Sequence, residues 1–384
     1  MTLSSLPRPT RATQQDGVHL AMPIIMGLAA GAAMLPYGFA PMDATMSFGL
    51  ITGIVAGLML AAVFADHASL RRSKQHAHNA AAWYLTAGIW LAMCAGGAGA
   101  ALIPTSHPVI VAVFCMSCAA GVDAAVMSTR VTHPQLIGTV HVCMIVFLLA
   151  ALGCATAICL DVRPSILAAS GVAMGVWGVQ MMANLVVRVP DRYLVQWRRY
   201  MTRRWTVRGS IPEDARMLTD DDVHEDMQRF LAQYTAGTVC CTVCVVLSFL
   251  ALATCVDYAA ALDRVAFIVA GVSIVLYLAL KPRQSGRPFE RYLMRGAAMV
   301  SLMAVVAFLP SALPQWGAQM PVAIIGVCAV VGLALGFGMI SQSNGFYSLA
   351  LSRIGDGCCF AALCLAPVAA LLSAGLVEWL RGIV

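Results

Sequence analysis

Residues 134–160 read PQLIGTVHVCMIVFLLAALGCATAICL, a run of 27 residues without Asp, Glu, Lys or Arg. A helix of that length extends about 40 Å, which exceeds the roughly 30 Å hydrocarbon core of a bilayer. Because the bilayer interior holds no water to satisfy backbone polar groups, a chain crosses it as a helix with internal hydrogen bonds. This stretch is therefore predicted to be a membrane-spanning α-helix.

The rest of the chain has the same character. Of its 384 residues, 60% are hydrophobic and 11% are charged, whereas soluble domains carry about a quarter charged residues. The 14 cysteines fall mostly inside apolar runs, which is not the pattern of a small disulfide-stapled secreted domain. The formal charge of +6 bears on orientation in a membrane, and we predict no nucleic-acid partner. The expected fold class is all-α, a polytopic helical membrane protein.

Apolar stretches long enough to span predict eleven transmembrane helices, six before a long polar segment and five after it. They are 19–41, 46–65, 81–103, 108–128, 134–160, 164–188, 232–255, 264–280, 295–313, 319–340 and 357–380. We therefore divide the chain into a cytoplasmic tail, transmembrane helices 1–6, a cytoplasmic amphipathic and acidic linker, and transmembrane helices 7–11. These parts are residues 1–18, 19–188, 189–231 and 232–384.

The basic residues predict the orientation, because Lys and Arg are retained on the cytoplasmic side. With the N-terminus inside, 21 of the 24 Lys and Arg fall in inside segments. The three outside are Arg163, Arg264 and Arg381. We predict a cytoplasmic N-terminus and, from the odd number of spans, a C-terminus on the outer side.

The linker contains two segments of opposite charge. In DRYLVQWRRYMTRRW (191–205), aromatic residues recur at helical spacing and arginines take the other face, which favours a helix on the cytoplasmic leaflet. The acidic stretch PEDARMLTDDDVHEDM (212–227) predicts a second helix, capped at Thr219, that runs into the seventh span. The candidate lipid- or partner-docking residues are Arg192, Trp197, Arg198, Arg199, Arg203, Arg204, Asp220, Asp221, Asp222 and Glu225. The acidic face is either a docking surface or simply a solvated one.

Two ionisable residues lie deep in predicted spans, where such groups are costly and mark a functional hypothesis. Asp123 lies seven residues before Arg130, and His141 lies eight residues after His133. Both fall roughly 10 to 12 Å below the cytoplasmic boundary, on helices joined by a tight turn. We predict a buried Asp123–His141 pair, which either fixes helix register or serves as a proton relay or coupling site.

Motifs for chemistry are missing from the sequence. It has no GxxxxGK[ST] run and no HExxH, and the CxxC spacings at Cys115–Cys118 and Cys241–Cys244 have no matching His or second pair. We predict no catalytic residue, no metal site and no cofactor, and so a protein that is not an enzyme.

The predicted chain has eleven spans in Ala-, Gly- and Val-rich helices, which a charged cytoplasmic linker divides into six and five. This plan resembles the EccD membrane component of actinobacterial type VII (ESX) secretion systems. The local sequences that carry the resemblance are LALKPRQSGRPFERYLMRGA (278–297) and QRFLAQYTAG (228–237), within a likeness that extends from His19 onward. The family usually has a cytoplasmic ubiquitin-like domain before its first span. About 18 residues precede the first span here, so this chain is expected to lack that domain.

The resemblance implies a non-enzymatic scaffold of a type VII protein secretion complex in the bacterial cell (inner) membrane. Such a subunit dimerises, encloses membrane lipid, contacts other secretion-complex membrane subunits and surrounds membrane helices of an FtsK-like ATPase. The alternative function is a secondary transporter or permease that uses Asp123 and His141 as a coupling pair. A transporter typically shows inverted repeats and helices broken at the midplane. Prolines interrupt some spans, but not at matching positions in the two halves.

Overall fold

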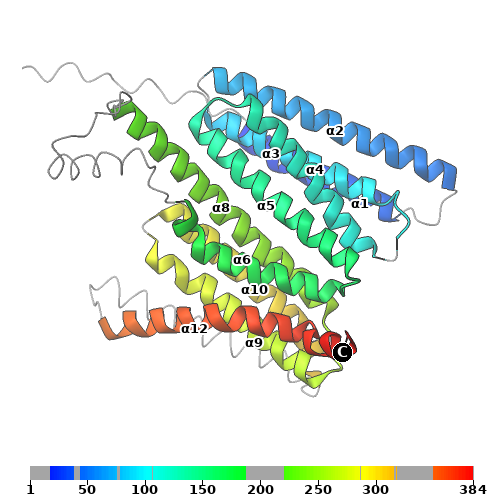
Figure 1. Cartoon of the computed structure of the whole chain (residues 1–384), viewed down its shortest axis with the longest axis vertical. Helices are drawn as coiled ribbons and strands as arrows, with labels where there is room; N and C mark the ends of the chain where they lie inside the picture. Colours follow the sequence, from blue (N-terminus) through cyan, green and yellow to red (C-terminus); the bar gives the residue numbers. More distant parts are fainter. Residues whose placement is uncertain are drawn as a thin grey trace, which may run out of the picture. The chain divides into compact units, whose positions relative to one another are not determined.

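The computed structural model describes residues 18–38, 44–75, 78–105, 107–186, 220–285, 287–314, 317 and 349–383. These residues form helices and short connections, with no strand among them (Figure 1). The helices are α1 (Val18–Gly38), α2 (Ala44–Lys74), α3 (His78–Ala100), α4 (Pro108–Arg130), α5 (Pro134–Cys159), α6 (Pro164–Val186), α8 (Asp220–Cys255), α9 (Ala261–Leu280), the 3₁₀ turn η1 (Lys281–Gln284), α10 (Pro288–Ala312), α12 (Leu349–Ser373) and α13 (Leu376–Ile383).

Within the described residues, nine helices are long and apolar enough to cross a membrane. They match nine of the predicted spans, and α1, with the apolar segment Ile24–Met34, matches the first. The predicted span 319–340 lies outside the described residues. The prediction of an all-α polytopic membrane protein is confirmed.

Proline and glycine set several helix ends. Helices α4, α5 and α10 each have proline in the first turn, where the missing N–H costs nothing and the fixed φ suits a helix. Between α12 and α13, Gly375 has φ of 72°, a left-handed conformation that glycine adopts without a steric penalty. The last apolar stretch, predicted as one span over 357–380, is therefore a long helix followed by a short one.

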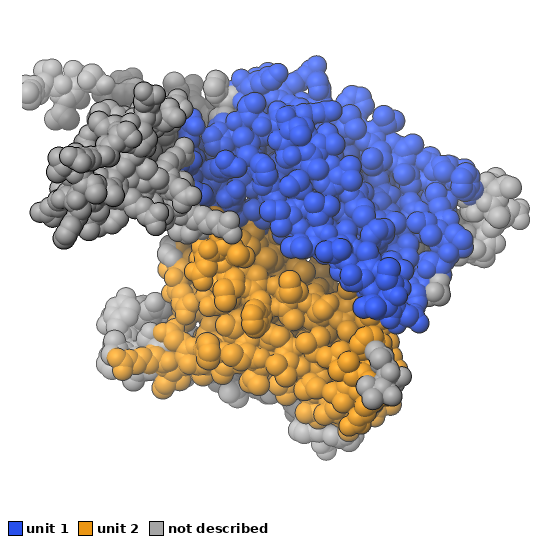
Figure 2. All heavy atoms as spheres, viewed as in Figure 1, with its two compact units in different colours: residues 1–161, 210–236 blue, residues 162–209, 237–384 orange. Residues whose placement is uncertain are grey.

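The chain forms two compact units (Figure 2). Unit 1 is Met1–Asp161 with Ser210–Ala236, and unit 2 is Val162–Gly209 with Gly237–Val384. The first boundary falls between α5 and α6, whereas the division made from the sequence falls at the linker after the sixth span. Helix α8 contributes its first part to unit 1 and the remainder to unit 2.

In unit 1, α3 is the central helix. It packs against α1, α2 and α4, and α4 packs against α5. In an 18-residue apolar stretch of α3, 61% of the residues are buried, whereas 17% are buried in the corresponding stretch of α5. The helix can be central because it is narrow: a Cβ added at Gly96 would overlap the carbonyl oxygen of Cys115 on α4, so the two backbones touch there.

In unit 2, α9 takes the central place and packs against α10 and α12, while α12 also packs against α6. Its core is aromatic. The rings of Phe249 on α8 and Phe267 on α9 stack with centroids 5.5 Å apart, and Tyr258 meets Phe267 edge-on at 5.6 Å. Both phenylalanines are fully buried. Such ring pairs stabilise a core beyond the area they bury.

Candidate functional site

Each of the two predicted intramembrane residues has a described neighbour in the structure. The carboxyl of Asp123 on α4 lies close enough to the carboxyl of Asp66 on α2 for the two groups to interact electrostatically. The Nδ1 atom of His141 lies 2.8 Å from the carbonyl oxygen of Ile137, one turn earlier in α5. The structure thus adds Asp66 as a neighbour of Asp123, and the predicted Asp123–His141 pair stays a prediction.

Asp66 was missed because the apolar run predicted as the second span stops at residue 65. Helix α2 continues without a break to Lys74, so Asp66 lies inside the helix and not in a loop. The signal that could have found it is the lack of any Gly or Pro between residues 58 and 74. A chain without such breakers tends to stay helical past the end of its apolar run.

The Asp66 carboxyl is deeply placed. Only 7% of the residue is exposed, and a Cβ added at Gly88 on α3 would overlap its Oδ1 atom. Three residues further on, the buried hydroxyl of Ser69 donates a hydrogen bond to the carbonyl oxygen of Ala81, at 2.9 Å. Glycine at position 88 therefore provides the space that lets a carboxyl enter the α2–α3 interface.

A second polar group of residues lies at one end of unit 2, in the basic segment quoted for the family resemblance. The Nζ atom of Lys281 donates hydrogen bonds to Oε1 of Gln180 on α6, at 2.8 Å, and to Oε1 of Gln284, at 3.0 Å. Because Lys281 directly follows α9, these bonds tie the ends of α6 and α9 together.

The start of α10 is ordered by a buried acid. Glu290 is 2% exposed, accepts a hydrogen bond from the hydroxyl of Ser285, and has Arg287 Nη1 3.7 Å from its Oε1. The Nε atom of Arg291 donates to the carbonyl oxygen of Ser285 at 2.9 Å. The segment is thus a built turn that presents Arg287, Arg291 and Arg295 on the surface.

The predicted docking residues of the linker are described only in part. The basic-helix residues, which are Arg192, Trp197, Arg198, Arg199, Arg203 and Arg204, lie outside the described residues. Asp220, Asp221 and Asp222 form the first turn of α8, and Glu225 is exposed one turn later. As predicted, the acidic helix continues without interruption into the seventh span, and α8 runs for 36 residues.

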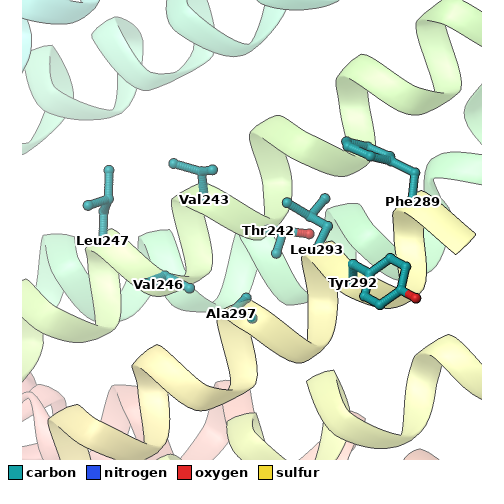
Figure 3. Close-up of a pocket in the computed structure, with 9 residues that line it drawn as sticks. Thr242, Val243, Val246, Leu247, Phe289, Tyr292, Leu293 and Ala297 are labelled. Atoms are coloured by element: carbon teal, nitrogen blue, oxygen red, sulfur yellow. The ribbon is translucent and has the colours of Figure 1, made fainter. Parts of the chain in front are cut away.

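An apolar groove of about 410 Å³ lies within unit 2, between α8 and α10 (Figure 3). It is lined by Thr242, Val243, Val246, Leu247, Phe289, Tyr292, Leu293, Gly296 and Ala297. The hydroxyl of Thr242 is already used, because it donates to the carbonyl oxygen of Thr238 at 2.7 Å. The groove therefore suits hydrocarbon and offers little to a polar ligand.

In the part of the chain that the structure describes, no group of three or more His, Cys, Asp and Glu is arranged to hold a metal ion. The cysteines of the two CxxC spacings are free thiols. Cys244 packs on α6, with Sγ 3.6 Å from the carbonyl oxygen of Gly171. This contact is part of the packing of α8 against α6.

No family model matches the chain, and no curated protein matches it by sequence. A solved structure described as protomer 1 of the ESX-3 core complex has a similar fold, with a TM-score of 0.60. The two chains are 13% identical, and the match covers 96% of this chain and 78% of that one. At this identity the likeness is one of fold.

Proposed function

We propose that the chain is a multi-pass membrane subunit of a type VII protein secretion complex and acts there as a non-enzymatic scaffold. The observation that carries the proposal is the fold likeness to a protomer of the ESX-3 core complex, which extends over 96% of this chain. The apolar helices support a place in the membrane. The plan of spans and the basic segment 278–297 support the more specific role of an EccD-like component.

In this proposal the chain lies in the bacterial cell membrane with its N-terminus in the cytoplasm and its C-terminus outside. The distribution of basic residues supports that orientation, since α2 ends on Arg71, Arg72 and Lys74 and α4 ends on Arg130. Single cysteines at positions 287 and 161, in a cysteine-depleted background, test it. Position 161 should react with an impermeant reagent in intact cells, and position 287 only after lysis. The reverse pattern would contradict the orientation.

The proposed partners are membrane lipid, a second copy of this chain, other membrane subunits and an FtsK-like ATPase whose helices the scaffold surrounds. Helix α2 supports the helix–helix part of this proposal. Its glycines 49, 53 and 57 lie four residues apart, and no described atom comes within 4 Å of where their Cβ atoms would be. Such a row of small residues permits close approach of another helix.

The linker is proposed to join the complex through charge. The basic helix binds the anionic leaflet and holds the acidic start of α8 toward a basic surface of the ATPase, where complementary charge orients association. Reversal of Asp220, Asp221, Asp222 and Glu225 to Lys should leave the protein inserted and folded but release it from the ATPase.

The matched control replaces the three aspartates by Asn and the glutamate by Gln, which removes the negative charges without adding positive ones. This neutralised variant should retain less ATPase than the wild type and more than the reversed variant. Wild-type retention should weaken as ionic strength rises, because salt screens the attraction. Full co-isolation of the reversed variant with its partners, together with normal secretion, would exclude docking through this segment.

A secondary transporter is the alternative function, and the buried carboxyl of Asp123 favours it, since intramembrane carboxyls serve proton relays. Proton flux into liposomes that contain the purified chain distinguishes the two functions. A transporter should carry protons, and Asp123→Asn should abolish that flux without loss of folding. A scaffold should show no flux above that of empty liposomes.

A further inference from the structure

The groove between α8 and α10 has free space beside the backbone of α10. All the residues that line it belong to unit 2. Gly296 is one of them, and no described atom lies within 4 Å of the position that a Cβ atom would take there. The groove therefore has room for the hydrocarbon of another molecule against the helix.

The groove is short and lies near the start of α10. Its residues on this helix run from Phe289 to Ala297, which is about 12 Å of helix, and α10 begins at Pro288. A partner helix that crosses a bilayer extends about 30 Å and would need a track along the whole span. A groove confined to one end suits the thinner acyl chain of a lipid.

The two ends of the groove differ in polarity. Phe289 is 53% exposed and Tyr292 is 75% exposed, and both lie at the end nearer to the start of α10 (Figure 3). Tyrosine is enriched at membrane–water interfaces, because its ring is apolar and its hydroxyl group is polar. Beyond the other end, α10 exposes Val300 and Met303. A lipid in the groove would thus have its polar end near Tyr292 and its chain toward the membrane interior.

Two arginines lie beside the polar end of the groove. Arg295 follows Tyr292 by three residues and Arg291 by four, so the three side chains are neighbours on the surface of α10. Both arginines are exposed. A guanidinium group presents a planar fork of N–H donors that matches the oxygens of a phosphate. The pair therefore suits the phosphate of a lipid headgroup.

The turn before α10 holds these arginines without neutralising them. The acid of this turn, Glu290, is 2% exposed and lies 3.7 Å from Nη1 of Arg287. Arg291 is positioned by the hydrogen bond from its Nε to the carbonyl oxygen of Ser285. Its two Nη atoms carry four further N–H bonds. The positive charge of Arg291 and Arg295 is thus presented on the exposed side of the helix.

We propose that one anionic phospholipid binds here, with an acyl chain in the groove and its phosphate against Arg291 and Arg295. The lipid comes from the leaflet that borders the start of α10. Charge complementarity selects the anionic headgroup, and the groove holds the chain between α8 and α10. The site gives the lipid partner of the proposed function a place and a chemical class, and it rests on the membrane location in that proposal and not on the secretion role.

The first experiment measures lipid binding to the purified full-length wild-type chain by native mass spectrometry. Phosphatidylglycerol and phosphatidylcholine with the same acyl chains are titrated separately. One phosphatidylglycerol should bind per chain, at least about fivefold more tightly than phosphatidylcholine, because one basic residue near an anionic headgroup contributes about that factor. The preference should shrink as ionic strength rises. Equal binding of the two lipids, or binding of neither, would overturn the proposal whether or not the chain serves secretion.

The second experiment fills the groove. Gly296→Leu places a side chain in the space that the acyl chain would occupy, so this variant should lose the bound phosphatidylglycerol. Gly357→Leu on α12 is the matched control, because Gly357 is also exposed and has no described atom within 4 Å of its Cβ position. The control should bind lipid like the wild type. Equal lipid binding in the two variants would contradict a site in the groove.

The third experiment removes one charge. Arg295→Gln should weaken phosphatidylglycerol binding about fivefold and leave phosphatidylcholine binding unchanged. Arg353→Gln, at an exposed arginine on α12, removes the same charge away from the groove and should have no effect. Should either groove variant fail to fold, the other one still decides. If Gly296→Leu keeps its phosphatidylglycerol but loses a membrane subunit on isolation from native membranes, a protein helix occupies the groove and the lipid site is wrong.

Discussion

Units 1 and 2 are both built from long apolar helices, but their centres are made from different residues. The central helix of unit 1, α3, is thin, with Ala81, Ala92 and Ala98 almost fully buried. The central helix of unit 2, α9, presents Phe267 and Tyr277, both fully buried. One core depends on backbone proximity and the other on interlocking side chains.

The difference affects what each core can accommodate. In unit 1 the narrow α3 leaves room at Gly88 for the carboxyl of Asp66 on α2. In unit 2 the rings of Phe249, Phe267 and Tyr258 fill the equivalent central space.

The largest effect is expected from Phe249→Ala in unit 2. The change removes a fully buried ring that stacks on Phe267, and such truncations cost about 3–5 kcal/mol. Thermal unfolding in nanodiscs measures it. Phe289→Ala, at an exposed ring of the same unit, is the control and should change stability little. Equal losses in the two variants would show that the aromatic centre of unit 2 is not what stabilises it.

The next largest effect is expected at the carboxyl pair of unit 1. Asp66→Leu removes the carboxyl beside Asp123 and leaves Asp123 as a polar group in apolar surroundings, at a cost of about 3 kcal/mol. The double change to Leu at both positions removes the orphaned group and should recover part of that loss. The double variant is compared with each single variant by unfolding at neutral pH. A double variant as unstable as the sum of the two single ones would show that the aspartates do not interact.

A smaller effect, about 2 kcal/mol, is expected from Gly96→Ala in α3, because the new methyl group would overlap the backbone of Cys115. Gly99→Ala is the matched control on the same helix, where the new Cβ would lie 3.8 Å from Val55. That control should be neutral or slightly stabilising, since alanine favours helix over glycine. If both variants are neutral, the close contact of α3 with α4 is not essential to unit 1.

The smallest effect, about 1 kcal/mol, is expected from Tyr258→Phe in unit 2. The hydroxyl donates a 2.7 Å hydrogen bond to the carbonyl oxygen of Ala253, and the phenyl ring retains the aromatic contacts. Burial raises the pKa of Tyr258 to about 12. The folded state then holds this proton longer than the unfolded chain, so stability should fall as pH rises from about 10 to about 12. In Tyr258→Phe this part of the fall should vanish, and an unchanged profile would contradict the assignment.

The sequence predicts the spans well because each depends on a local property, the length of an apolar run. It also predicts that the acidic helix continues into the seventh span, since no Gly or Pro separates Asp220 from the apolar residues of α8 before Gly237. The proximity of Asp66 to Asp123 is not predictable in this way, because the two residues are on helices that are not consecutive. Hydropathy also assigned Asp66 to the edge of its span, although the helix extends to Lys74.

The most direct test of the scaffold role is affinity isolation of the full-length chain from native membranes in mild detergent, followed by mass measurement of the intact assembly. We expect a second copy of the chain, other membrane subunits and a multi-domain ATPase in fixed proportion. Recovery of the chain as a lone monomer, under conditions in which the ATPase is extracted intact, would contradict the scaffold role.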